Sequence, residues 1–152
     1  SIATESLTES GELQNYLDKI RTSSFDLFKR GKSEDAIALI QKEIIEKKYA
    51  KDNDFSALGD IYLFNKQFVK AEEQYKKAID KNSSELLYQL KLAHVFMFSN
   101  KVDEAKAIHK LYKDNNVSSS KSWIAQTKFD FEDFEKRGFP TDNFKKILRI
   151  LE

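Results

Sequence analysis

The chain has 152 residues, enough for one domain with a real core, and its 40% apolar and 34% charged residues are typical of a soluble protein. Lys and Arg number 26 against 25 Asp and Glu, so the sequence lacks the basic surplus expected of a nucleic-acid-binding protein. The absence of Cys excludes disulfides, thiolate metal sites and cysteine nucleophiles. No apolar run approaches the roughly 20 residues that cross a bilayer. With only 4 Gly and 1 Pro for turns, the composition predicts an all-α protein without membrane insertion.

Helical periodicity begins after residues 1–11, which are polar and weakly patterned and are expected to form a flexible lead. Apolar residues at spacings of three and four then predict eight helices in four hairpins. The predicted turns within these hairpins lie at Gly31, Asn65-Lys66, Asn100-Lys101 and Gly138-Phe139-Pro140. Gly31 suits a left-handed residue at the end of the first helix, and Ser33 and Thr141 are expected to N-cap the helices that follow them.

Internal repetition is the most informative signal in the chain. The positions that recur 34 residues apart are Gly59 and Ala93, Tyr62 and Phe96, Phe68 and Val102, and Ala71 and Ala105. A small residue at a fixed position lets the two helices of a hairpin approach closely, and large residues fill the gap to the next hairpin. Such a unit has to stack on its neighbours to bury its apolar face. An ordinary helical bundle with chance periodicity is the alternative.

The central unit resembles the tetratricopeptide repeat family, whose pattern runs aromatic, Leu-Gly, Tyr, Ala, aromatic, Ala, Pro. The matching residues are Phe55, Leu58, Gly59, Tyr62, Ala71, Tyr75 and Ala78, with Ser83 where the family usually has Pro. The neighbouring units match in part, so the resemblance covers residues 14–116. It implies a right-handed superhelical array of about three hairpins over residues 12–116. The last pair, residues 117–152, departs furthest and is interpreted as a degenerate or capping hairpin.

In this family the first helix of each hairpin lines a concave groove that holds a peptide or a partner helix. The groove residues that the resemblance implies here are Arg21, Phe25, Phe28, Asp60, Leu63, Phe64, Leu87, Leu90, Lys91, His94, Met97 and Phe98. The same spacing also places Asp18, Lys29, Asn53 and Ser56 on this face. The clamp that some members use for acidic chaperone tails is not expected, because Phe25, Ala57 and Leu87 stand at three of its positions.

The predicted groove becomes more apolar toward the third unit, where Met97 and Phe98 lie. One interpretation is that an apolar or amphipathic partner segment docks on this surface. The other is that the chain's own fourth hairpin folds inward and covers part of the groove, which makes these residues core. Both interpretations are compatible with the sequence.

No motif in the chain points to catalysis, a metal or a cofactor. The two histidines, His94 and His109, lack a metal-binding pattern such as HExxH, and His109 is expected to pack between hairpins. Phosphate-binding Gly-rich loops and the Gly-x-Ser-x-Gly motif do not occur. We therefore predict a non-enzymatic protein without a cofactor.

The sequence predicts a scaffold or adaptor whose partner is another protein, and a homodimer is also compatible with it. Two alternatives remain. A small chaperone of bacterial secretion systems would hold apolar segments on a similar surface, and a docking domain could belong to a larger enzyme or lipoprotein. The chain begins at Ser1 without Met, which keeps the second alternative open. The expected location is cytoplasmic, with a periplasmic or membrane-tethered location not excluded by the sequence.

Overall fold

The computed structural model describes residues 11–152, which fold into α-helices with no β-strand among them. The all-α prediction is thus confirmed, while nearly all of the predicted flexible lead lies outside the described residues. The helices are α2 (Glu12–Lys29), α3 (Ser33–Ile40), α4 (Asp52–Phe64), α5 (Phe68–Lys81), α6 (Leu86–Phe98), α7 (Val102–Tyr112), α8 (Trp123–Lys136) and α9 (Phe144–Leu151). A π-helical turn, η1 (Gln41–Ile45), extends α3.

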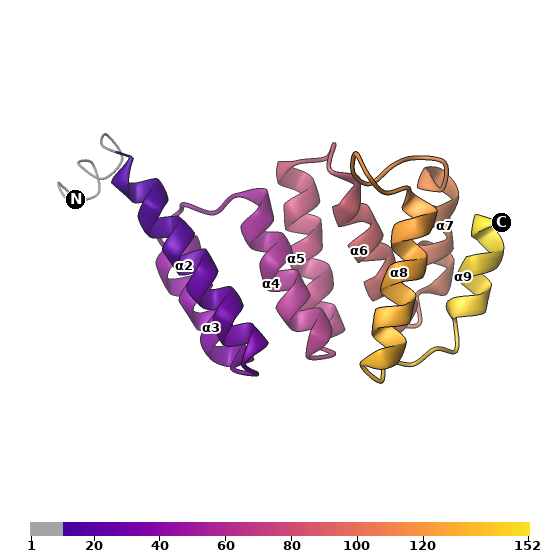
Figure 1. Cartoon of the computed structure of the whole chain (residues 1–152), viewed down its shortest axis with the longest axis horizontal. Coiled ribbons are helices and arrows are strands. Elements are labelled where there is room, and N and C mark those ends of the chain that lie inside the picture. The colour runs from indigo at the N-terminus through magenta and orange to yellow at the C-terminus, as the bar shows by residue number, and fades with distance from the viewer. Residues whose placement is uncertain (1–10) are drawn as a thin grey trace.

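The helices stand in a row, with α2 at one end of the row and α9 at the other (Figure 1). Helix α2 packs on α3, α4 on α5, and α6 on α7, so each of these neighbours in sequence forms a hairpin. Consecutive hairpins join through α3 against α4 and α5 against α6. The C-terminal pair differs, because α9 packs on α7 and meets α8 through the stacked rings of Phe131 and Phe144, 4.3 Å apart.

The turns of the first three hairpins have the same backbone geometry. Gly31, Lys66 and Asn100 are left-handed, with φ of 79°, 61° and 61°. In each case an amide beyond the turn donates to a carbonyl in the last turn of the preceding helix; Gln67 N lies 2.8 Å from Tyr62 O. This arrangement satisfies carbonyls that the helix end leaves free. The predicted left-handed conformation of Gly31 is confirmed.

Two predicted helix caps are wrong. Ser33 is the first residue of α3, and its hydroxyl lies 3.2 Å from Asn65 Oδ1 instead of capping the helix. Thr141 lies before the turn that leads into α9, and Asn143 occupies the N-cap position there without a side-chain cap. Both errors concern which residue of a short polar stretch begins the helix, and the existence of each helix is unaffected.

Helices α4 and α5 approach each other closely at Gly59 of α4. A Cβ atom on Gly59 would lie 2.6 Å from Cδ1 of Tyr75 on α5, well below the van der Waals contact distance of two carbon atoms. Tyr75 is fully buried, as are Ala71 and Ala78 on the same face of α5. Gly59 therefore allows α4 and α5 to pack around a full aromatic ring.

We expect Gly59→Ala to destabilise the protein by about 1–3 kcal/mol, because the new methyl group overpacks a filled interface. Equilibrium unfolding in urea measures this loss. In a Tyr75→Leu background, which removes the ring, the same substitution should cost markedly less. Equal costs in the two backgrounds would contradict the proposed clash.

Candidate functional site

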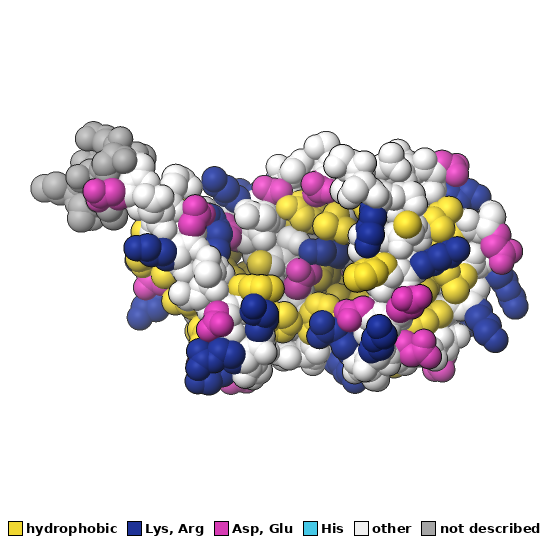
Figure 2. Space-filling view, viewed as in Figure 1, with side chains coloured by type: hydrophobic (Ala, Val, Ile, Leu, Met, Phe, Trp, Pro, Cys, Tyr) yellow, Lys and Arg dark blue, Asp and Glu magenta, His cyan; other side chains and the backbone are white. Residues whose placement is uncertain are grey.

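A cleft of about 690 Å³ opens between α2 and α4, and we call it the α2–α4 cleft. Its apolar lining comes from Phe25, Phe28, Ala57, Ile61 and Phe64, and its charged lining from Arg21, Lys29, Asp54, Asp60 and Arg137. Ser33 and Ile40 of α3 also line it, and Arg137 comes from the end of α8, so residues far apart in the sequence form the walls. Figure 2 shows apolar side chains in a hollow between the first helix pair and the rest of the row, with charged side chains around it.

An ion pair bridges the cleft and fixes the spacing of its walls. Arg21 on α2 donates from Nε to Asp54 Oδ1 at 2.7 Å and from its second terminal nitrogen to Oδ2 at 2.9 Å. Asp54 is only 1% exposed and also accepts from the backbone amide of Lys51 at 2.9 Å. A two-point Arg–carboxylate contact of this kind fixes orientation as well as distance. Next to it, the rings of Phe28 and Phe64 lie 6.0 Å apart.

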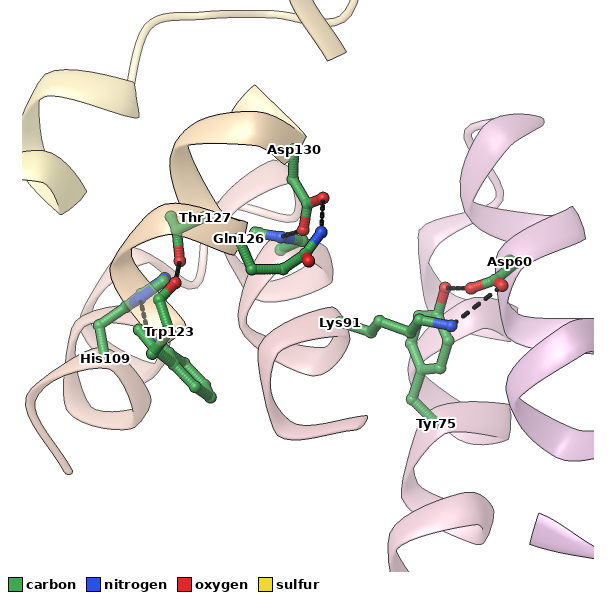
Figure 3. Close-up of polar contacts among 9 residues, drawn as sticks. Asp60, Tyr75, Lys91, His109, Trp123, Gln126, Thr127 and Asp130 are labelled. Carbon is green, nitrogen blue, oxygen red and sulfur yellow. Dashed lines mark hydrogen bonds and ion pairs between the residues drawn. The ribbon is translucent and has the colours of Figure 1, made fainter. Parts of the chain in front are cut away.

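Asp60 forms a second polar node on α4 (Figure 3). The Tyr75 hydroxyl donates to Asp60 Oδ1 at 2.6 Å, and Lys91 Nζ donates to Oδ2 at 3.1 Å and to the Ser56 hydroxyl at 2.9 Å. Burial, together with the negative charge of Asp60, raises the pKa of Tyr75 well above its ordinary value. The phenol therefore stays protonated and donates, and α4, α5 and α6 are tied together at one carboxylate.

Helix α8 and the turn after it cover the third unit of the predicted groove. The ring of Phe134 lies 5.0 Å from Phe98, 5.1 Å from His94 and 6.2 Å from Phe64. Phe139, just beyond α8, lies 5.1 Å from Phe98. These aromatic rings fill the α6 side of the groove, so the interpretation in which the chain covers its own groove describes this end of the molecule.

Polar contacts hold α8 in this position. His94 Nε2 lies 2.9 Å from Asp130 Oδ2, and Gln126 Nε2 donates to Asp130 Oδ1 at 2.8 Å. Further along α8, Trp123 Nε1 donates to His109 Nδ1 at 2.9 Å, and both side chains are buried (Figure 3). The two histidines thus anchor α8 to α6 and to α7.

A smaller pocket of about 190 Å³ adjoins the cleft on the other side of Phe64. Three carboxylates line it, those of Asp60, Asp130 and Asp133, together with Lys91. Phe64 and Asp60 belong to both spaces, so they form the boundary between them.

The structure divides the predicted groove residues into two groups. The residues that line the α2–α4 cleft are Arg21, Phe25, Phe28, Asp60 and Phe64. The residues at or near the third unit are Leu63, Leu87, Leu90, Lys91, His94, Met97 and Phe98, and of these Leu63, Leu90, His94 and Met97 are at most 3% exposed. Leu90 and Met97 thus have almost no surface for a partner in this structure, while Leu63 and His94 line the smaller pocket. The spacing of the apolar residues Leu63, Leu90 and Met97 is equally typical of core positions.

Sequence reasoning missed three residues that shape the site: Asp54, Phe134 and Arg137. Asp54 is a charged residue that follows a polar stretch. The sequence alone gives no sign that its side chain is buried against Arg21. Phe134 and Arg137 come from the C-terminal segment, and the repeat pattern says nothing about where that segment packs. A pattern-based search could have noted only the density of aromatic residues between Trp123 and Phe139.

The same substitution at two groove positions should separate core from accessible surface. Phe98→Glu should cost about 3 kcal/mol or more, because Phe98 packs among Phe68, Phe134 and Phe139 and would leave a charge there. Phe25→Glu should change stability by less than about 1 kcal/mol, since Phe25 is 58% exposed. Urea unfolding measures both. A stable Phe98→Glu protein would contradict the core position of this residue.

Burial, and then the proximity of His94, lower the pKa of His109 from its ordinary 6.5 to about 3. Protonating Nδ1 would also remove the acceptor that Trp123 uses. The folded protein therefore keeps His109 neutral, while the unfolded chain takes up a proton below pH 6.5. Stability consequently falls as the pH is lowered from 6.5 towards 3.

We expect the contribution of His109 to be about 1.4 kcal/mol of lost stability per pH unit below 6.5. His109→Asn keeps an acceptor near the Nδ1 position but does not titrate. Urea unfolding of the two proteins at several pH values in this range measures the effect. The difference in stability between them should shrink as the pH falls, and parallel pH profiles would contradict a neutral, buried His109.

No family model, curated protein or solved structure matches this chain. Within residues 11–152, His, Asp and Glu side chains do not gather in groups of three that could hold a metal ion. In the same range, no helix is both long enough and apolar enough to cross a bilayer. The functional argument therefore rests on the geometry of the α2–α4 cleft.

Proposed function

We propose that this chain is a non-catalytic scaffold that binds a segment of another protein in the α2–α4 cleft. The observation that carries the proposal is the cleft itself: an apolar floor and about 690 Å³ of open space, bridged by the Arg21–Asp54 ion pair. Sites for small ligands and side chains commonly fall between roughly 300 and 1,000 Å³, with mostly apolar walls and few polar groups. A bulky side chain from a partner fits this space.

The scaffold proposed here is a right-handed superhelical array of tetratricopeptide-like hairpins closed by the C-terminal pair. Its support is the recurrence of local geometry at the repeat spacing. Three left-handed turns occur at Gly31, Lys66 and Asn100, which are 35 and 34 residues apart. Ala71 and its counterpart Ala105 are fully buried where the helices of their hairpins meet.

Phe25 supports a binding role for the cleft. It is 58% exposed and lines the cleft, while the neighbouring ring of Phe28 is partly covered. Covering the remainder of the Phe25 ring would contribute on the order of 1 kcal/mol to binding. A partner side chain seated in the cleft would bring its apolar surface against Phe25 and Phe28 together.

A rigid, preformed surface is better supported here than a catalytic one. The buried polar groups of the cleft bind each other: Arg21 holds Asp54, and Asp60 accepts from Tyr75 and Lys91. Groups that are already fixed lose little conformational entropy when a partner binds. The proposal therefore includes no reaction and no cofactor.

Filling the cleft tests the proposal. Ala57 lines the cleft and is half-buried, so Ala57→Trp places an indole where the partner side chain would sit. Peptides selected from a random-peptide library on the wild-type protein should bind Ala57→Trp at least about tenfold more weakly, a loss of about 1.4 kcal/mol. Fluorescence anisotropy of the synthetic peptides measures the affinity, and amide shifts in NMR spectra should change on α2 and α4.

The matched control is Ala107→Trp, the same substitution at an exposed position of α7 outside the cleft. It should leave peptide binding unchanged. If Ala57→Trp proves misfolded by circular dichroism, Phe25→Ala replaces it, because Phe25 is exposed and adds little to the core. Selected peptides that bind all of these proteins equally would contradict the proposed site.

A further inference from the structure

Each oxygen of the two carboxylates in the α2–α4 cleft already accepts a hydrogen bond from the protein. Asp54 Oδ1 accepts from Arg21, and its Oδ2 accepts from Arg21 and from the Lys51 amide. Asp60 Oδ1 accepts from Tyr75, and its Oδ2 accepts from Lys91. Each oxygen already has a short, charge-assisted or hydroxyl partner. The negative charge of these carboxylates is therefore already partly balanced by Arg21 and Lys91.

The cations at the mouth of the cleft have free donors. Lys29 has no anionic partner among residues 11–152, and its Nζ lies 4.9 Å above the ring of Phe25. Arg137 donates through Nε to Asp133 at 2.9 Å, while its two terminal nitrogens have no acceptor in the described part of the chain. The Arg137 guanidinium lies over the Phe64 ring at 4.5 Å. The cleft thus offers hydrogen-bond donors and positive charge to a ligand.

These donors stand beside the apolar surface that the partner would cover. Lys29 lies over Phe25 on the α2 wall, and Arg137 lies over Phe64 on the α4 wall. Each wall therefore presents one aromatic ring and one cation close together. The ring centroids of Phe28 on α2 and Phe64 on α4 lie 6.0 Å apart, and the two walls meet there at the floor of the cleft.

We infer that the partner segment carries a carboxylate side chain next to a bulky apolar side chain. The apolar side chain lies between the rings, and the carboxylate accepts from Lys29 or Arg137 at the mouth. This inference rests on the proposed function, since it specifies the chemistry of the segment that the cleft binds. Because the cations lie at the solvent-exposed mouth, they contribute to selectivity and to the rate of association more than to total affinity.

The test uses random-peptide selection on the full chain, followed by affinity measurements on synthetic copies of the selected peptides. Peptides recovered on the wild-type protein should pair Asp or Glu with a large apolar residue. Their affinity should fall about tenfold or more for the double variant Lys29→Glu/Arg137→Glu and should weaken with rising NaCl. The control Lys110→Glu/Lys145→Glu makes the same change in net charge at exposed positions of α7 and α9 and should leave affinity unchanged.

The outcomes separate this inference from the proposed function. Selected peptides that lose binding to Ala57→Trp but lack acidic residues, or that bind Lys29→Glu/Arg137→Glu normally, contradict the acidic partner and leave the cleft as the site. Enrichment of Lys or Arg also contradicts it and points to the pocket of Asp60, Asp130 and Asp133. If the peptides are insensitive to Ala57→Trp and to Phe25→Ala, the proposed function itself is wrong.

Discussion

The contact between Gly59 and the ring of Tyr75 governs much of the structure. Because Gly59 has no side chain, α5 approaches α4 closely enough to place a whole aromatic ring between them. That approach brings the Tyr75 hydroxyl within 2.6 Å of Asp60, one helical position beyond the glycine. Asp60 is thereby held in an orientation that lets Lys91 reach it from α6. One missing Cβ atom thus determines how three helices meet and how the boundary of the cleft is built.

Three carboxylates of α4, those of Asp52, Asp54 and Asp60, bind side chains of neighbouring helices. Asp52 accepts from the Tyr88 hydroxyl on α6 at 2.6 Å, and this hydrogen bond lowers the pKa of Asp52. Asp54 holds Arg21 on α2, and Asp60 faces α5 and α6. Taking charged groups out of water costs much of what their pairing contributes, so such pairs stabilise a fold only modestly. We infer that their main effect is on geometry, because each pair sets the distance of one neighbouring helix from α4.

The parts of the structure that the sequence predicted are those determined by neighbouring residues. Helical periodicity and the left-handed turn at Gly31 depend on contacts within one hairpin, and they agree with the structure. The position of α8 depends on how Phe134 packs with Phe64, a residue far away in the sequence, and no local pattern encodes that pairing. Repeat spacing alone therefore selected some residues that line the cleft, such as Phe28, together with buried residues such as Met97. Arg137 was missed for the same reason.

The last residues of α2, α4 and α6 differ in a way that explains where the surface stays open. They are Lys29, Phe64 and Phe98, at spacings of 35 and 34 residues. Phe98 is covered by Phe134 and the C-terminal segment, while Phe64 contacts Phe134 but also lines the α2–α4 cleft. Lys29 is charged and exposed, and within residues 11–152 its ammonium lies over a ring of its own helix, Phe25, and over no ring of the C-terminal segment. The aromatic residues of α8 and of the turn after it therefore pack over the helix row from its C-terminal end as far as Phe64. The α2–α4 cleft is left uncovered.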